Sequence, residues 1–224
     1  MGYEENIERI YEQLCRNGYK STNEITADAK LNNILNDVFE LEALPQVVDA
    51  KTFTEVDGKI MFSGVTKLDS MQKFLTPNFR KREHDKPAPY WFIDDVRVAK
   101  QYAYAKTCEN IITVKESPDF KLIDINNFSD LYCNGSKLKN SNINPNAKFK
   151  KKQEVVDFVI LDKYGEADDH SDMYMALLHD YDSLSHTEWM KEKYPNEPQV
   201  HIIYRRKNLI LTKSPKASNF IQEL

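Results

Sequence analysis

The feature that most limits the fold of this chain is a change in the spacing of its apolar residues near residue 59. Before that point, apolar residues recur every three or four positions, and this spacing predicts helices over residues 4–17 and 27–43. Gly18 and Pro45 follow these segments as residues that end helices. Beyond residue 59 the apolar residues form short runs, which are typical of strands. The pattern therefore predicts an α+β fold with a helical N-terminal part.

The strand-rich part is expected to occupy residues 59–224 and the helical part residues 1–58, within a single domain. Asp49 is expected to cap a short helix that leads into the first strand. A polar stretch over residues 126–152 is interpreted as a surface loop or an insertion. The predicted strands cover residues 59–64, 90–93, 111–114, 121–125, 155–161, 200–204 and 209–212.

Composition narrows the cellular setting and the partners. No segment approaches the roughly 18 apolar residues of a membrane span, and the acidic start of the chain does not resemble a secretory signal. Three scattered cysteines favour a reducing compartment, so we expect a cytoplasmic protein without a membrane partner. A net charge of −4 makes nucleic acid an unlikely partner. The basic runs at residues 148–152 and 205–207 are interpreted as a solvated loop and a solvated hairpin turn.

Residues 89–105 predict a strand followed by a tight turn and a helix. Tyr90-Trp91-Phe92-Ile93 is a buried strand in this interpretation, and either Asp94 or Asp95 caps the helix that follows. One face of that helix is expected to carry Val96, Ala99, Tyr102 and Ala103.

Four segments in order resemble the ADP-ribosyltransferase family. The stretch Tyr90–Asp94 is similar to the family's Tyr-Phe-Ala-x-Asp strand, which a helix with Ala and Tyr follows. The other three segments are Met61-Phe-Ser-Gly-Val-Thr, then Asn110-Ile-Ile-Thr-Val with Phe120-Lys-Leu-Ile-Asp-Ile, and finally Ala176-Leu-Leu-His-Asp-Tyr-Asp-Ser-Leu with the strand pair after Gln199. The resemblance spans roughly residues 59–214. It implies a mixed, mainly antiparallel β core.

The resemblance also implies a function: binding of NAD and transfer of ADP-ribose to a protein target. It implies that Phe62, Ser63, Gly64, Tyr90 and Phe92 contact NAD. The implied catalytic residues are Glu197, Gln199 and Tyr90. Cleavage of the nicotinamide–ribose bond passes through an oxocarbenium-like state, which a nearby carboxylate stabilises.

The sequence departs from the family pattern at two of these positions. Ser63 stands where family members carry an arginine or histidine, and a serine supplies no charge to a phosphate. Gln199 stands where they carry a glutamate, so Glu197 is the nearest carboxylate that could replace it. Lys67, Arg80 and Arg82 are candidates for the missing cation. The alternative is a catalytically inactive member of this fold, or another α+β domain, that binds a protein partner through its N-terminal helices and polar insertion.

A stretch rich in aspartate and histidine, residues 168–186, allows two interpretations. His179 and Asp182 at i, i+3 could share one helical face and ligate a metal. The spacing matches no zinc template, and the segment equally suits a capped helix over residues 173–179, so no metal is expected. Ser185 and Glu188 suggest a capping box before another short helix that ends near residue 193.

Overall fold

The computed structural model describes residues 2–26, 29–65, 74–76, 89–102, 111–127, 152–157, 159–160, 170–187 and 198–212. The chain forms two compact units that interleave along the sequence. The helical unit comprises residues 1–41, 80–88 and 123–181, and the sheet unit comprises residues 42–79, 89–122 and 182–224. The α+β class is confirmed by this mixture of helices and sheet. None of the described helices has the length and apolar character that a membrane span requires.

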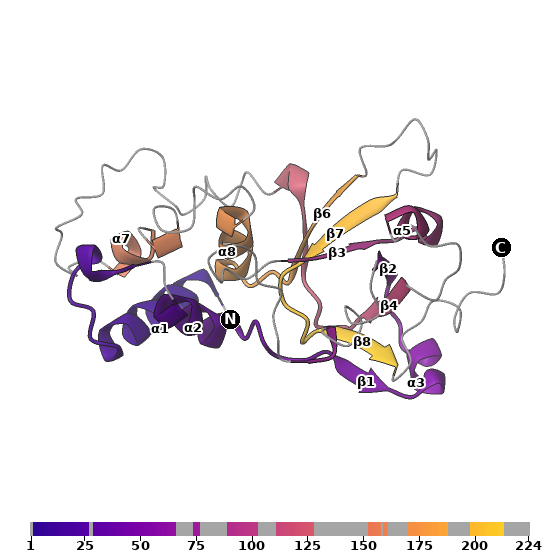
Figure 1. Cartoon of the computed structure of the whole chain (residues 1–224), viewed down its shortest axis with the longest axis horizontal. Coiled ribbons are helices and arrows are strands. Elements are labelled where there is room, and N and C mark those ends of the chain that lie inside the picture. The colour runs from indigo at the N-terminus through magenta and orange to yellow at the C-terminus, as the bar shows by residue number, and fades with distance from the viewer. Residues whose placement is uncertain are drawn as a thin grey trace. The chain divides into compact units, whose positions relative to one another are not determined.

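The helical unit is built around α1 (Tyr3–Arg16), which packs against α2 (Ala29–Phe39), α7 (Lys152–Asp157) and α8 (His170–Leu178) (Figure 1). Between α1 and α2 lies a short turn of 3₁₀ helix, η1 (Thr22–Glu24). The apolar stripe of α1 is buried as its spacing predicts, and Leu31, Ile34 and Leu35 supply the buried face of α2.

Both long N-terminal helices end in a left-handed residue. Gly18 has φ +87°, and the N–H groups of Gly18 and Tyr19 donate to the carbonyls of Cys15 and Leu14, a Schellman motif that confirms the predicted stop. Glu40 has φ +55° after α2, and the Leu41 N–H donates back to Asn36 O. The prediction that α2 extends to residue 43 was therefore wrong, because the chain turns before Pro45 is reached.

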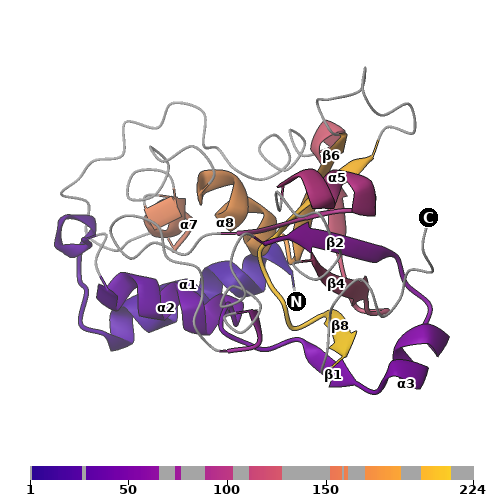
Figure 2. The ribbon, with the colours of Figure 1, turned by 45° about the vertical axis from the view of Figure 1, so that its right-hand side comes forward.

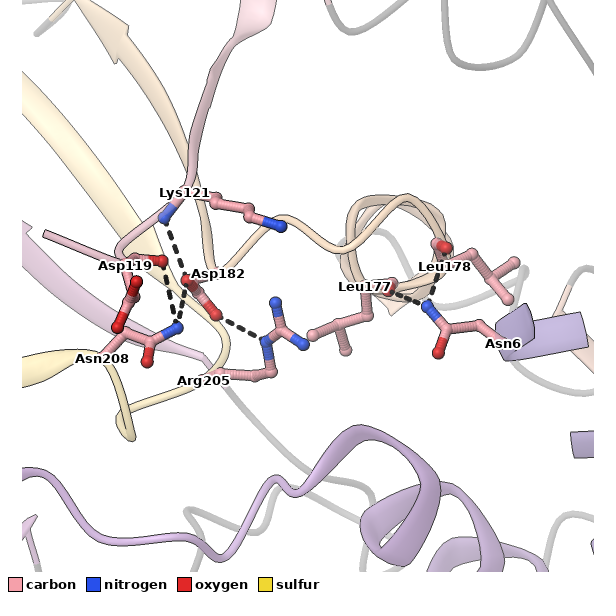
Figure 3. Close-up of polar contacts among 8 residues, drawn as sticks. All are labelled: Asn6, Asp119, Lys121, Leu177, Leu178, Asp182, Arg205 and Asn208. Carbon is pink, nitrogen blue, oxygen red and sulfur yellow. Dashed lines mark hydrogen bonds and ion pairs between the residues drawn. The ribbon is translucent and has the colours of Figure 1, made fainter. Parts of the chain in front are cut away.

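Helix α8 is buried from Met173 to Leu178. Its C-terminal carbonyls are satisfied by a side chain from α1: the amide of Asn6 donates to Leu177 O at 3.3 Å and to Leu178 O at 2.9 Å (Figure 3). His179, just beyond the helix, stacks on Tyr3 with ring centroids 4.4 Å apart. The predicted helix over residues 173–179 is thus confirmed, with a start three residues earlier.

The sheet has eight strands in the order β1-β8-β4-β2-β3-β7-β6-β5. Strand β1 runs parallel to β8, whereas the β2–β3, β2–β4, β3–β7, β4–β8 and β6–β7 pairs are antiparallel. The strands are β1 (Gln46–Val48), β2 (Ile60–Gly64), β3 (Tyr90–Ile93), β4 (Ile111–Glu116), β5 (Leu122–Asp124), β6 (Ser183–Thr187), β7 (Gln199–Ile203) and β8 (Leu209–Thr212).

Two short helices accompany the sheet. Helix α3 (Ala50–Glu55) follows β1 (Figure 2). The Asp49 carboxylate accepts from the Thr52 N–H at 2.8 Å, which confirms the predicted cap. The buried Lys115 ammonium donates to the carbonyls of Phe53 and Val56 at 2.8 and 2.7 Å, where α3 ends. Helix α5 (Val96–Tyr102) packs against β2 and β3.

Alternation along β3 defines two faces of the sheet. The Trp91 face carries Trp91 and Ile93, and α5 covers part of it through a cluster with Phe62 and Val200. The Tyr90 face carries Tyr90, Phe92 and the residues opposite them on neighbouring strands. Tyr102, at the end of α5, is 47% exposed and so does not join the buried face predicted for it; Ala103 lies outside the described residues.

Two predicted elements differ from the structure here, and strand β1 was not predicted. Residues 155–157 of the predicted strand 155–161 belong to helix α7, because a short run of buried valines fits a helix as well as a strand. Ser185 lies in strand β6 and does not begin a helix. Strand β1 is only three residues long, too short for its alternation to be recognised.

The ends of four strands meet at one buried carboxylate. Asp182, fully buried, accepts from Arg205 Nε at 2.6 Å, from the Lys121 N–H at 3.0 Å and from Asn208 Nδ2 at 2.9 Å (Figure 3). Its backbone joins the same region, since its N–H donates to Lys121 O and its carbonyl accepts from Tyr204 N–H. Arg205 is itself only 3% exposed, so this is a buried ion pair within the sheet unit.

We predict that Asp182→Asn lowers the free energy of unfolding by about 3–5 kcal/mol, because it leaves the buried Arg205 charge uncompensated. Urea unfolding followed by circular dichroism measures the change. The matched control is Glu12→Gln, which removes an exposed ion pair with Arg16 and should cost less than about 1 kcal/mol. Equal effects of the two substitutions would contradict the role assigned to Asp182.

Candidate functional site

Four of the residues that the sequence singled out lie on the Tyr90 face, on three neighbouring strands. Phe62 pairs with Ile93, so Ser63 of β2 stands opposite Phe92 of β3. Phe92 in turn pairs with His201 of β7. Gln199 lies two residues before His201, and its side chain therefore points to the same face.

The remaining predicted site residues do not join this group. Phe62 is buried on the Trp91 face beneath α5. Gly64 pairs with Ile111 at the end of β2 and has no side chain to present. Glu197 and the three candidate cations Lys67, Arg80 and Arg82 lie outside the described residues.

The aromatic part of the Tyr90 face is a packed cluster of three rings. Phe74 meets the ring of Tyr90 edge-on with centroids 5.1 Å apart, and meets Phe92 in a tilted arrangement at 5.5 Å. Tyr90 is 6% exposed and Phe92 is buried. These rings therefore form a floor under the site, while Ser63 and Gln199 are the partly exposed members of the group.

A cation that the sequence did not suggest lies against this cluster. The Arg206 guanidinium stands 5.3 Å from the ring centroid of Tyr90 and 5.7 Å from that of Phe74. Arg205 and Arg206 were predicted to lie in a solvated hairpin turn; the turn is there, but both side chains are buried, so that prediction was wrong. Burial lowers the pKa of the Arg206 guanidinium, and the nearby Tyr90 and Glu42 oppose that shift.

The polar end of the same face is organised by Asp94. Its carboxylate forms an ion pair with Lys59 at 2.8 Å and accepts from the Gln199 N–H at 2.8 Å. Asp95, and not Asp94, caps helix α5, because its Oδ1 accepts from the Arg97 N–H at 2.8 Å. The hydrogen bonds from Arg97 also lower the pKa of Asp95. Asp95 thus caps helix α5, whereas Asp94 binds the backbone at the start of β7.

His201 sits between the aromatic and polar parts of the face. Its side chain is completely buried, and no described residue hydrogen-bonds to either ring nitrogen. Burial lowers the pKa of His201 to about 4; the charges of Lys59 and His186 add to this effect, and Asp94 opposes it. At neutral pH the His201 imidazole is therefore neutral. It lies opposite Phe92, while the buried Arg206 guanidinium lies against Tyr90 and Phe74.

The metal interpretation of residues 168–186 has no support among the described residues, where no group of three potential ligands gathers. Helix α8 ends at Leu178, so His179 and Asp182 do not share a helical face. Asp182 instead serves the ion pair with Arg205.

Comparisons with known proteins add no relative: no family model, no curated protein and no solved structure matches this chain. The chemistry available to the site thus comes from its own residues. The buried aromatic rings give the site an apolar floor, Arg206 and Lys59 carry positive charge, and Ser63 and Gln199 offer neutral hydrogen-bonding groups.

We predict that stability falls as the pH is lowered from 6.5 to 4, partly because of His201. Its pKa in the folded protein is about 4, below the value near 6.5 of an unfolded chain. The unfolded state therefore binds the proton at a higher pH than the folded state does. By pH 4 this group lowers the free energy of unfolding by about 3 kcal/mol.

Urea unfolding at a series of pH values measures this dependence. The variant His201→Phe should show a flatter profile across that window. Ser185→Ala, at the position paired with His201 on β6, removes no titrating group and should keep the full slope. A His201→Phe profile as steep as that of the natural chain would contradict the assignment.

Proposed function

We propose that this chain is an ADP-ribosyltransferase-like protein that binds NAD over the Tyr90 face and transfers ADP-ribose to a protein target. One observation carries the proposal. Ser63, Tyr90, Phe92 and Gln199 were selected from three separate sequence segments, and they come together on one face of three adjacent strands. If the resemblance were due to chance, residues chosen from separate segments would have no reason to fall on the same face of the sheet.

The proposed roles follow from exposure and charge. Ser63 and Gln199 are partly exposed and would contact NAD directly, with Ser63 as a hydrogen-bonding group and Gln199 facing the ribose hydroxyls. Tyr90 and Phe92 would support the nicotinamide side of the site from below. Glu197, two residues before Gln199, would supply the carboxylate that stabilises the oxocarbenium-like state.

A second candidate function is a catalytically silent domain that binds a protein partner. It is favoured by the chemistry of the described residues at the polar end of the site. Gln199 is neutral, and the carboxylate of Asp94 is already engaged by Lys59 and by the Gln199 N–H. Removal of one electrostatic contact of this kind typically lowers a rate by about 100- to 1000-fold.

We predict that NAD binds to the purified chain and that Gln199→Glu raises the rate of nicotinamide release by about 100- to 1000-fold, because it places a charge beside the developing cation. Calorimetry measures NAD binding, and chromatography measures nicotinamide release in the same sample. Gln199→Asn is the matched control and should leave release unchanged or lower. NAD binding without a gain in Gln199→Glu would favour a catalytically silent domain. No binding at millimolar NAD would contradict the transferase proposal and leave the domain that binds a protein partner.

A second substitution tests the source of the native carboxylate. We predict that Glu197→Ala lowers nicotinamide release by about 100-fold or more while NAD affinity changes little, since the carboxylate acts mainly on the transition state. Release rates and calorimetric affinities from one preparation separate the two effects. An unchanged rate would remove Glu197 from the proposed mechanism.

A further inference from the structure

Arg206 is a fully buried arginine, and the described residues pair with only part of its guanidinium. It lies in the turn between β7 and β8, and its side chain reaches the Tyr90 face. Nη1 donates to Phe74 O at 2.6 Å and to Thr76 O at 3.1 Å. One of the two terminal nitrogens is therefore fixed by backbone carbonyls of the sheet unit.

The other edge of the guanidinium is different. Nε and Nη2 are both buried, and no described residue accepts a hydrogen bond from either of them. These two nitrogens carry the parallel N–H groups of the side-on edge, which binds carboxylates and phosphates in a bidentate manner. The edge of Arg206 that is best suited to bind an anion, Nε with Nη2, is thus the edge that the described residues leave unpaired.

The rest of the guanidinium is enclosed. The rings of Tyr90 and Phe74 lie 5.3 and 5.7 Å from the central carbon, distances at which cation–π attraction operates. These contacts and the two carbonyls orient the side chain. The Nε/Nη2 edge is consequently held in position before any ligand arrives, which lowers the entropy cost of binding.

Burial of this charge, with no described carboxylate paired to it, makes the arrangement costly. A buried donor without an acceptor loses its hydration, and the loss is larger for a charged group. Arginine does not escape the cost by deprotonation in a protein. Glu42 attracts Arg206 through its charge, but its side chain is exposed and does not pair with Nε or Nη2. An anion with two oxygens would remove the imbalance.

We propose that the Nε/Nη2 edge of Arg206, beside the rings of Phe74 and Tyr90, is a binding site for an oxyanion, the phosphate or carboxylate group of a small molecule. The site is independent of the proposed transferase function: it depends on Arg206 and its neighbours, and not on Gln199, Glu197 or cleavage of NAD. Two sources share this chemistry, free inorganic phosphate and the phosphate of a nucleotide, and the experiment separates them.

The test follows the arginine Nε–H signals by ¹H–¹⁵N spectroscopy of the whole chain during titration with inorganic phosphate. Sodium chloride at matched ionic strength is the salt control. We expect one protected Nε–H signal, assigned by its loss in Arg206→Lys, to shift with saturation, and the melting temperature to rise by several degrees at saturating phosphate. Titration with AMP then identifies the source: tighter binding than phosphate indicates a nucleotide, and equal binding indicates the free ion, and both support the site.

Three variants sharpen the result. Arg206→Lys keeps a positive charge but loses the bidentate edge, so phosphate affinity should fall at least tenfold. Glu42→Gln removes a competing negative charge and should raise the affinity severalfold. Arg97→Lys is the control, because Arg97 pairs with Asp95 on α5, and it should bind phosphate like the natural chain.

Two results would overturn the proposal. One is an Arg206 Nε–H signal that does not move with tens of millimolar phosphate, acetate or AMP. The other is an equal shift with chloride, which would mean general screening of charge. The readout is separate from nicotinamide release, so failure here leaves the transferase proposal standing, and failure of that proposal leaves this one testable.

Discussion

Asp182 accepts hydrogen bonds through both carboxylate oxygens and through its carbonyl, and these bonds connect the start of β6 with the residues before β5 and the turn after β7. A buried ion pair is not in itself a strong source of stability, since desolvation of both charges offsets their attraction. Its consequence here is geometric. The pair with Arg205 fixes where β7 ends, and the next residue along the chain is Arg206.

That position explains why adjacent arginines have different surroundings. The Arg205 side chain turns to Asp182, while that of Arg206 reaches Tyr90 and Phe74 on the aromatic cluster. The same alternation separates Asp94, which belongs to the polar end of the site, from Asp95, which caps α5. In both pairs of neighbours, one residue maintains the fold and the other contributes to the candidate site.

Local signals were sufficient for much of the fold. The stripe of α1 and its Gly18 stop, the Asp49 cap of α3, and the sequence of strand, aspartate and helix after Tyr90 all depend on neighbours within a few residues. Strand β6 was missed because Ser183 and Ser185 are buried polar residues, and no apolar alternation marks them. Helix α7 was missed because its two buried valines also suit a strand.

The site was harder to predict because its decisive contacts are distant in sequence. Register placed Ser63, Phe92 and His201 in one row across three strands, and only the strand pairing reveals it. Arg206 resembles a solvated turn residue in the sequence, yet the carbonyl that it contacts on Phe74 is 132 residues away. A local pattern cannot report such a contact, whereas the departures at Ser63 and Gln199 were visible without a structure.

Both proposals place the ligand over the Tyr90 face of the sheet and not the Trp91 face. The most direct measurement is a side-chain NMR titration with NAD, because Tyr90, Trp91 and Phe92 are consecutive and alternate between the faces. We expect the ring signals of Tyr90 and Phe92 to shift with saturation while the indole N–H of Trp91 does not. A saturating shift of Trp91, with Tyr90 and Phe92 unchanged, would contradict it.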